Sequence, residues 1–191
     1  MVLVLASRNA HKLGEMRRLL APAGIGVEAL PDAVTLPAED GERYAEIALR
    51  KARAAAAALG RAAIADDSGI EAAALHGAPG VRSARFAGEH SSDAENLAKL
   101  MALAPAGSEL RFVCALAYVD PIASVERVFT GECRGRLAAE RRGARGFGYD
   151  PGFLADAGPS GRTIAELDDA EKDAISHRGN AARALAAWLG A

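Results

Sequence analysis

The sequence predicts a mixed α/β domain, and three observations support that prediction. The chain has 191 residues, of which 50% are hydrophobic, enough for one sizeable core. Short apolar runs typical of buried strands, beginning with Val2 to Ala6, alternate with amphipathic helical patterns. Two apolar runs, Arg111 to Asp120 and Val125 to Cys133, are separated by a short turn at Pro121, which favours an antiparallel pair. We therefore expect one domain over residues 1–191, with helices and strands in mixed order.

Composition and charge exclude several classes of function. The formal net charge is −2 and the pI is about 6.1, whereas a dedicated nucleic-acid binder usually has a strongly basic face. No apolar run approaches the ~20 residues that span a bilayer, and the N-terminus lacks the basic region of a signal peptide. Cys114 and Cys133 have no CxxC spacing and are expected to be reduced core residues. We expect a soluble, cytoplasmic protein with no nucleic-acid or membrane partner.

The first predicted unit is a strand, a polar turn and a helix. The strand Val2 to Ala6 is followed by a helical pattern from Lys12, with Asn9 as a plausible N-cap and Glu15 on the polar face. The N-terminus of a helix is a general anion site, because its N–H groups are unpaired and its dipole favours negative charge. A cation in the first turn, such as Lys12, opposes that dipole and is better explained by a bound anion. The alternative is an ordinary surface lysine.

A loop and a long helix precede the central stretch of the chain. Val27 to Leu30 is predicted to be a short strand, and Pro31 to Gly41 a loop with two prolines and an acidic end that includes Glu39. Tyr44 to Leu59 is alanine-rich and strongly helical, and Gly60 is expected to end it.

The most informative stretch is AAIADDSGIE, Ala62 to Glu71. We expect a strand over Ala62 to Ala65 that ends in a polar turn containing Asp66, Asp67 and Ser68. Carboxylates at a strand end lie where open α/β sheets bind ligands. Two adjacent acids repel unless a cation or a proton sits between them, and oxygen ligands of this kind suit magnesium. The structural alternative is a solvated acidic turn with a capping serine.

The second half of the chain holds a further motif, GFGYDPGF, at Gly146 to Phe153. Its aromatic rings are suited to stacking on bases, and its glycines allow close backbone approach. Ser92 to Glu95 is a capping box that opens a helix to about Ala104. The other expected elements are a loop over His76 to Gly88, a solvated segment with five arginines over Arg134 to Arg145, a short helical or loop segment over Thr163 to Lys172, and a final helix to Leu189 that Ser176 caps.

Several of these residues suit binding of a polyphosphate. Lys12, Lys51 and Lys172 stand at element ends beside polar turn residues, and a triphosphate needs such cations. Glu39 and Asp67 can complete a magnesium shell with phosphate oxygens, and the other acid of the aspartate pair can then take a proton from water. A Ser68–His177 hydrolase triad is disfavoured, because no oxyanion-hole glycine motif flanks the serine.

Taken in order, the motifs resemble the Ham1/RdgB family, the inosine triphosphate pyrophosphatases that hydrolyse non-standard purine nucleoside triphosphates. The resemblance runs nearly end to end. The motifs that carry it are ASRNxxK (Ala6 to Lys12), ExG (Glu39 to Gly41), LxKA (Leu49 to Ala52), IADDSG (Ile64 to Gly69), GAPGVRSAR (Gly77 to Arg85), GFGYDP (Gly146 to Pro151), TxAEL (Thr163 to Leu167) and EKxxxSHRG (Glu171 to Gly179).

The resemblance implies an elongated, two-lobed α/β fold with mixed sheets, similar to the ITPase and Maf proteins. It also implies a homodimer and an active site in the cleft between the lobes. Mg²⁺ would be held by Glu39 and Asp67, with Asp67 also the proton acceptor. The implied substrate contacts are Ser7, Arg8, Asn9, Ala10, His11 and Lys12 on the triphosphate, Lys51, Ser68 and Lys172 elsewhere on the substrate, and Phe147, Gly148, Tyr149, Asp150, His177 and Arg178 around the base.

One position departs from the family pattern: many members have TGN where this chain has Ser7-Arg8-Asn9, so an arginine replaces a glycine. Two other functions stay open, a nucleotide-binding sensor without turnover and a family relative with a different base preference. The acid pair counts against a sensor, because a pure binder gains little from adjacent carboxylates near a polyphosphate. Donors on His177 and Arg178 predict that a purine 6-oxygen is accepted and the amino group of adenine rejected.

Overall fold

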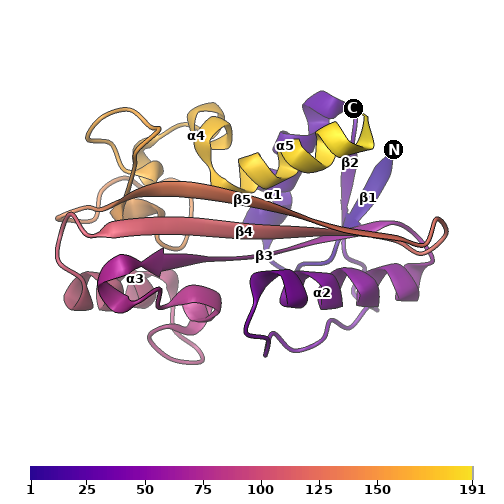
Figure 1. Ribbon diagram of the computed structural model, residues 1–191, viewed down its shortest axis with the longest axis horizontal. Helices are drawn as coiled ribbons and strands as arrows, with labels where there is room; N and C mark the ends of the chain where they lie inside the picture. Colours follow the sequence, from indigo (N-terminus) through magenta and orange to yellow (C-terminus); the bar gives the residue numbers. More distant parts are fainter. Residues whose placement is uncertain (191) are drawn as a thin grey trace. The chain divides into compact units, whose positions relative to one another are not determined.

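The computed structural model describes residues 1–190 and has the expected mixed α/β architecture (Figure 1). Six strands form one sheet in the order β2-β1-β3-β4-β5-β6. The strands are β1 (Val2–Leu5), β2 (Gly26–Ala29), β3 (Ala63–Ala72), β4 (Glu109–Asp120), β5 (Val125–Leu137) and β6 (Phe153–Ala155). The α-helices are α1 (Ala10–Leu20), α2 (Tyr44–Leu59), α3 (Asp93–Leu103), α4 (Asp169–Ile175) and α5 (His177–Leu189).

The chain divides into two compact units, each made of separate chain segments. The first, unit 1, comprises residues 1–67, 114–131 and those from 178 onward. In it β1 pairs in parallel with both β2 and β3. Helices α1 and α5 pack on one face of these strands and α2 on the other, so that unit 1 has three layers and two hydrophobic cores (Figure 1).

Helix α2 packs on the sheet through small side chains. Its buried residues include Ala48, Ala52 and Ala55, which share a core with alanines of β3 and β4. Alanine is also the strongest helix former, so one residue type serves both the helix and its close packing. The helix ends where Gly60 takes a φ of +61°, a left-handed conformation that glycine adopts at no steric cost.

The second unit, unit 2, comprises residues 68–113 and 132–177. Its core gathers side chains from β3, α3, β4, β5 and β6, and includes Phe112 and Phe153, whose ring centroids lie 4.5 Å apart. Helix α3 begins with the predicted capping box, in which Ser92 Oγ accepts from the Glu95 backbone N–H and the Glu95 carboxylate accepts from the Ser92 backbone N–H.

The structure corrects the expected end of the central strand. The predicted strand over Ala62 to Ala65 does not stop at the acid pair, because β3 continues through Asp66, Asp67 and Ser68 to Ala72. The apolar run ends at Ala65, but strand pairing does not, since β4 lies along the other side of β3. The two acids are tolerated inside a strand because buried cations face them, as described below.

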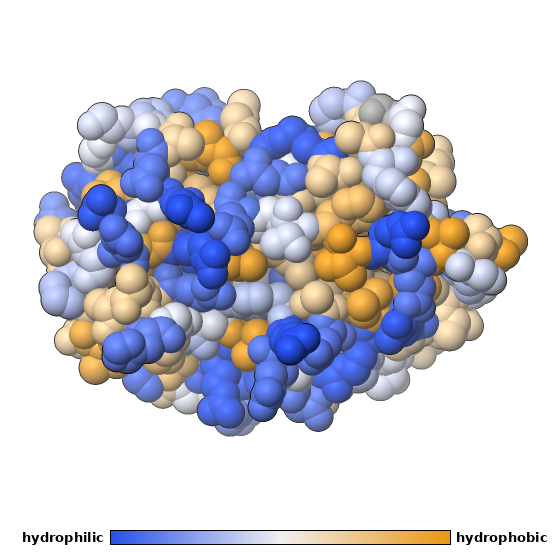
Figure 2. All heavy atoms as spheres, in the orientation of Figure 1, coloured by the Kyte–Doolittle hydropathy of each residue, from blue (hydrophilic) through white to orange (hydrophobic). Residues whose placement is uncertain are grey.

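The two cysteines are core residues, as their spacing predicted. Cys114 and Cys133 are both free and buried. On the face shown in Figure 2, hydrophilic and apolar residues are interspersed. Among residues 1–190, no helix is both long and apolar enough to cross a bilayer.

Candidate active site

The acid pair lies just beyond the carboxyl end of a neighbouring strand. The last register pair between β1 and β3 is Leu5 with Ile64, so Asp66 and Asp67 extend past the end of β1. Successive side chains of a strand point to opposite faces, and the two carboxylates accordingly have different partners. Both groups of partners belong to unit 1.

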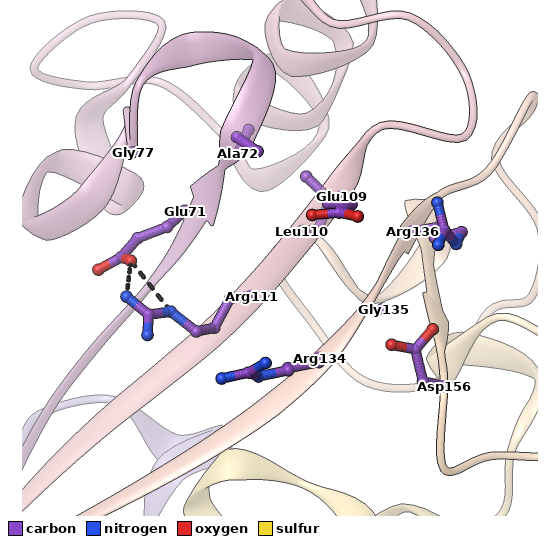
Figure 3. A pocket seen from close by; sticks show the side chains of 11 residues that line it. Glu71, Ala72, Gly77, Glu109, Leu110, Arg111, Arg134, Gly135, Arg136 and Asp156 are labelled. Atoms are coloured by element: carbon purple, nitrogen blue, oxygen red, sulfur yellow. Dashed lines mark hydrogen bonds and ion pairs between the residues drawn. The ribbon is translucent and has the colours of Figure 1, made fainter.

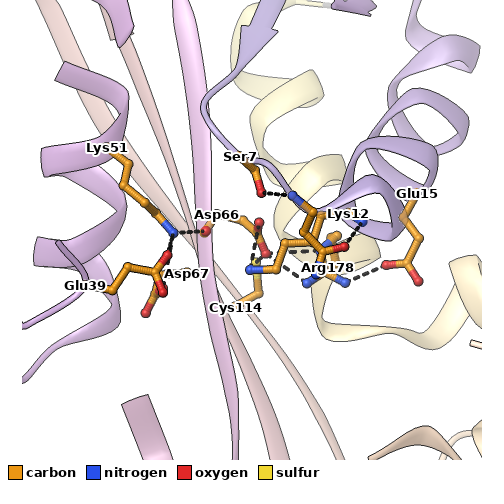
Figure 4. Close-up of polar contacts among 10 residues, drawn as sticks. Ser7, Lys12, Glu15, Glu39, Lys51, Asp66, Asp67, Cys114 and Arg178 are labelled. Atoms are coloured by element: carbon orange, nitrogen blue, oxygen red, sulfur yellow. Dashed lines mark hydrogen bonds and ion pairs between the residues drawn. The ribbon is translucent and has the colours of Figure 1, made fainter. Parts of the chain in front are cut away.

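Asp66 is fully buried and is surrounded by cations (Figure 4). Its Oδ1 lies 3.2 Å from the ammonium of Lys12, and its Oδ2 accepts from Nη2 and Nε of Arg178 at 2.8 and 3.1 Å. Burial alone would raise the pKa of Asp66, but the charges of Lys12, Arg178 and Lys51 hold it well below its usual range. Asp66 is therefore a permanent negative charge.

Arg178 is bound on its other side by a residue that the helical pattern predicts to lie on the polar face of α1. Its Nη1 donates to Oε2 of Glu15, whose side chain is buried in α1. Helical periodicity could not reveal this, because the partner is 163 residues away. Glu15 and Asp66 together raise the pKa of Arg178 against the opposing effect of burial.

Asp67 faces the ammonium of Lys51 (Figure 4). Lys51 Nζ donates to Asp67 Oδ1 at 3.3 Å, to Glu39 Oε1 at 2.8 Å and to the backbone oxygen of Asp66 at 2.9 Å. Burial raises the pKa of Asp67 to about 6, although Lys51 and Lys12 oppose the shift. A carboxylate with a pKa near neutrality is suited to take up and release a proton at physiological pH.

Glu39 and Asp67 also suit a hard divalent cation. Both carboxylates approach the same ammonium, so they already converge on one centre of positive charge. The Asp67 side chain is 8% exposed and that of Glu39 48% exposed, which leaves one side of the pair accessible. Magnesium typically binds one or two carboxylates together with phosphate oxygens and water, and this donor set fits it. Within residues 1–190, no group of three or more His, Cys, Asp or Glu side chains is placed to hold a metal.

The turn after β1 is ordered as a helix N-terminus. The Asn9 Oδ1 accepts from the Lys12 backbone N–H at 3.1 Å, which confirms Asn9 as the N-cap, and Ser7 Oγ accepts from the Asn9 N–H at 3.2 Å. Ala10 and His11 occupy the exposed first turn of α1, which starts two residues earlier than the helical pattern suggested. Lys12 has its anionic partner in the protein itself, the carboxylate of Asp66.

The GFGYDP motif lies in unit 2 and is held by its own hydrogen bonds. Lys172 Nζ donates to Asp150 Oδ2 at 2.6 Å, and the same oxygen accepts from the Phe147 backbone N–H at 3.0 Å. The Lys172 ammonium also lies 5.1 Å from the centroid of the Phe147 ring. The Gly148 N–H donates to Asp93, and the Tyr149 hydroxyl donates to the backbone oxygen of Ser83.

His177 and Arg178, the two hydrogen-bond donors expected at the base, have different surroundings in the structure. His177 is buried in unit 2, with its ring stacked on Phe112 at 4.7 Å and 10°. The guanidinium of Arg178 gives hydrogen bonds to Asp66 and Glu15 in unit 1. This residue thus neutralises buried carboxylates, and its contact with a base stays a prediction. Ser68 follows Asp67 on β3 and is half-buried.

A separate cavity of about 380 Å³ lies in unit 2 and contains no predicted site residue (Figure 3). Its charged lining is mixed in sign, with Arg134, Arg136 and Asp156 beside a Glu71–Arg111 ion pair. Arg111 also pairs with Glu132 at 2.9 Å. This internal pairing distinguishes the cavity from the cation-rich surroundings of Asp66.

Comparison with known proteins gives consistent matches over the whole chain. The profile of the Ham1 family matches residues 3–188. A dITP/XTP pyrophosphatase of Frankia alni is 53% identical, covering 99% of this chain and 97% of the relative. One from Mycolicibacterium paratuberculosis is 50% identical, covering 96% and 93%. The solved structure of a HAM1 protein from Coxiella burnetii has a TM-score of 0.87 at 40% identity, covering 100% of this chain and 98% of that one.

Proposed function

The chain belongs to the Ham1 family, and on that premise we propose that it is a magnesium-dependent nucleoside triphosphate pyrophosphohydrolase. Its substrates are the non-canonical purine nucleotides ITP, dITP and XTP, and its products are the nucleoside monophosphate and pyrophosphate. The names of the relatives, dITP/XTP pyrophosphatase, support this choice of substrate. The observation that carries the proposal is the set of cations and carboxylates around Asp66 and Asp67 at the end of β1.

In the proposed reaction Asp67 acts on water. Its carboxylate accepts a proton as the water oxygen bonds to phosphorus, the α–β phosphoanhydride bond breaks, and pyrophosphate leaves. Burial raises the pKa of Asp67 to about 6 in the metal-free chain, and a bound divalent cation would lower it, so the carboxylate is ionised and able to accept a proton at neutral pH. Glu39 and Asp67 would hold Mg²⁺, which when bound supplies positive charge to the phosphates.

The triphosphate is bound by the turn Ser7 to Lys12 and by Lys51. The exposed first turn of α1 offers backbone N–H groups, which suit phosphate oxygens at a helix N-terminus. Lys12 and Lys51 are oriented by Asp66, Asp67 and Glu39, so their charges are held in place before a substrate arrives. This preorganisation lowers the entropic cost of binding a flexible polyanion.

The base is recognised by the GFGYDP motif and by His177. Phe147 stacks on the purine, and His177 donates towards its 6-position, where hypoxanthine and xanthine have an oxygen and adenine an amino group. The backbone of Phe147 to Asp150 excludes the 2-amino group of guanine. Ser68, Lys172 and Arg178 complete the proposed substrate contacts, with Lys172 ordered by Asp150.

The decisive experiment is a nucleotide panel with and without magnesium. We expect pyrophosphate release from ITP, dITP and XTP at rates far above those with ATP or GTP, and loss of turnover when magnesium is chelated. Calorimetric binding of ITP without any product would identify a sensor instead. Comparable efficiencies with ITP and ATP would indicate a different base preference.

We also propose that the enzyme works as a cytoplasmic homodimer that removes deaminated purine nucleotides before polymerases use them. Sedimentation equilibrium of the purified chain tests the oligomeric state. A mass of about one chain, 19.7 kDa, would contradict the dimer.

A further inference from the structure

Arg8 is the residue that departs from the family pattern. Its backbone belongs to the turn after β1, but its side chain donates hydrogen bonds to backbone carbonyls of a different segment. Its Nη1 donates to the backbone oxygen of Leu30 at 2.7 Å and to Oδ1 of Asp32 at 3.3 Å. Its Nη2 donates to the backbone oxygens of Pro31, Asp32 and Val34 at 2.9, 3.2 and 2.8 Å. One guanidinium thus binds four carbonyls of a single loop.

That loop lies between β2 and α2 and contains no helix or strand over residues 30–43. Its first part is held by Arg8. Its second part is held from α2, where Arg50 donates to the Ala38 backbone oxygen at 3.1 Å and pairs with Asp40 at 2.7 Å. Glu39 lies between the two residues that Arg50 contacts and five residues beyond Val34, the last residue that Arg8 contacts, and its carboxylate contacts Lys51.

The position of Glu39 therefore depends on how its backbone is held. Its side chain is about half exposed, so packing alone does not fix it. A loop of this length without its own secondary structure loses much conformational entropy when it is ordered. Four carbonyl dipoles that converge on one point repel one another unless a cation with several donors lies between them. The planar guanidinium supplies donors in a fixed fork, which a lysine ammonium does not.

We propose that Arg8 is a positioning residue for Glu39, and through it for the divalent cation. Its backbone belongs to the turn that binds phosphate, while its side chain orders the loop that carries a metal ligand. Arg8 thereby couples the phosphate turn to the metal-binding loop within unit 1. This inference rests on the proposed function, because it takes Glu39 to be a metal ligand.

The test compares Arg8→Ala, Arg8→Lys and a matched control, Arg17→Ala. Arg17 also donates to a backbone carbonyl of unit 1, that of Val27 at 2.9 Å, but outside the loop. Two quantities are measured: amide hydrogen exchange of residues 35–41 in the metal-free protein, and the magnesium concentration that gives half-maximal hydrolysis of ITP. Thermal melting of each variant separates these local effects from a general loss of stability.

For Arg8→Ala we expect exchange in residues 35–41 to rise about tenfold and the half-activating magnesium concentration to rise about tenfold, the scale seen when a residue that orients a ligand is removed. A positioning role predicts that the half-activating magnesium concentration changes by a larger factor than the turnover number measured at saturating magnesium. Arg8→Lys should restore part of both effects, and Arg17→Ala should change neither.

The proposal is overturned if Arg8→Ala leaves loop exchange or the magnesium requirement unchanged, or if Arg17→Ala alters both equally. It is also overturned if Arg8→Ala raises the KM for ITP at saturating magnesium and nothing else, which would make Arg8 a direct substrate contact. A wild-type protein that does not hydrolyse ITP or XTP would refute the proposed function instead, and the exchange measurement would still decide whether Arg8 orders the loop.

Discussion

At the scale of single residues, Asp66 and Asp67 are neighbours with opposite acid–base behaviour. Asp66 has three cations around a fully buried carboxylate, which keeps its pKa far below the usual range. Asp67 has mainly Lys51 to offset its burial, and its pKa rises to about 6. Burial opposes ionisation in both cases, so the balance of nearby cations and carboxylates decides which of the two can exchange a proton, and Glu39 and Asp66 add to the upward shift of the Asp67 pKa. The structure thus separates a carboxylate that stays ionised from one that can take up a proton near neutral pH.

The first prediction concerns Asp67. Asp67→Asn keeps the shape of the side chain but can neither accept a proton nor supply a full charge to a metal, so turnover of ITP should fall at least ~100-fold. Binding of ITP, measured by calorimetry, should persist. Glu28→Gln is the control, since Glu28 is a half-exposed carboxylate of the same unit that pairs with Arg61. Near-normal activity of Asp67→Asn would refute its role.

The second prediction concerns Lys12, for which the structure changes the expectation. As a lysine in the first turn of a helix, its removal should be neutral or slightly stabilising. Its contact with Asp66 reverses this, because a fully buried carboxylate would lose one of its cations. We expect Lys12→Ala to lower the free energy of unfolding by about 1–3 kcal/mol in urea titrations and to raise the KM for triphosphates.

Lys12→Arg is the matched variant for that measurement, because it retains the charge. It should recover most of the stability, whereas the KM should recover less if the compact ammonium itself meets a phosphate. An unchanged KM in Lys12→Ala, together with lower stability, would leave the lysine a purely structural role.

At the scale of secondary structure elements, one ion network ties three elements of unit 1 together. Glu15 lies on α1, Asp66 on β3 and Arg178 at the start of α5, and all three are buried. Replacing a buried charge leaves its partners uncompensated, which costs more than the pair itself contributes. The network is therefore sensitive to the loss of its central cation.

The third prediction follows from that network. Arg178→Met should lower the free energy of unfolding by about 3–5 kcal/mol, because Glu15 and Asp66 both lose their shared partner. Arg183→Met, an exposed position of the same helix, should have little effect. Urea unfolding followed by circular dichroism measures both. Equal effects of the two substitutions would show that the network contributes little to stability.

Elements with strong local patterns were predictable from the sequence, and long-range ion pairs were not. The alanine pattern and Gly60 predicted the bounds of α2, and the Ser92 capping box predicted the start of α3, because helix signals are local. The predicted end of the central strand was wrong, since the length of a strand depends on neighbouring strands that the local sequence does not describe. The burial of Glu15 was missed for the same reason, as its partner comes from the far end of the chain.

For the candidate site too, residues in local motifs were predictable and long-range contacts were not. The motifs identified Glu39, Lys51 and Asp67, which the structure brings into contact in unit 1. The carbonyl contacts of Arg8 had no signature in the sequence, because backbone acceptors are the same at every residue.

At the scale of the whole molecule, each unit contains one cysteine in its own core. Cys114 belongs to unit 1 and Cys133 to unit 2. Burial raises the pKa of the Cys114 thiol to about 12, with a further contribution from Asp66, and that of Cys133 to about 11. Since the thiolate is the reactive form, both should be inert in the native protein.

The fourth prediction uses these thiols as reporters. At pH 8 the native chain should show no thiol that reacts with an aromatic disulfide reagent, and the chain in urea should show both of its two cysteines. Mass spectrometry of labelled peptides at intermediate urea then reports the opening of unit 1 through Cys114 and of unit 2 through Cys133. Rapid labelling of either cysteine without urea would contradict the burial described here.

The segmented make-up of unit 1 has a consequence for the order in which the protein is made. Translation adds Asp66 long before Arg178, which follows it by 112 positions. All of unit 2, residues 68–113 and 132–177, is synthesised between these two residues. Unit 1 therefore cannot complete its core until α5, the last helix of the chain, has been made. During that interval the nascent chain carries Asp66 and Glu15 without their shared guanidinium. A chain that terminates early, before α5, would retain every motif up to Lys172 and lack the cation that neutralises the buried acids of its candidate active site.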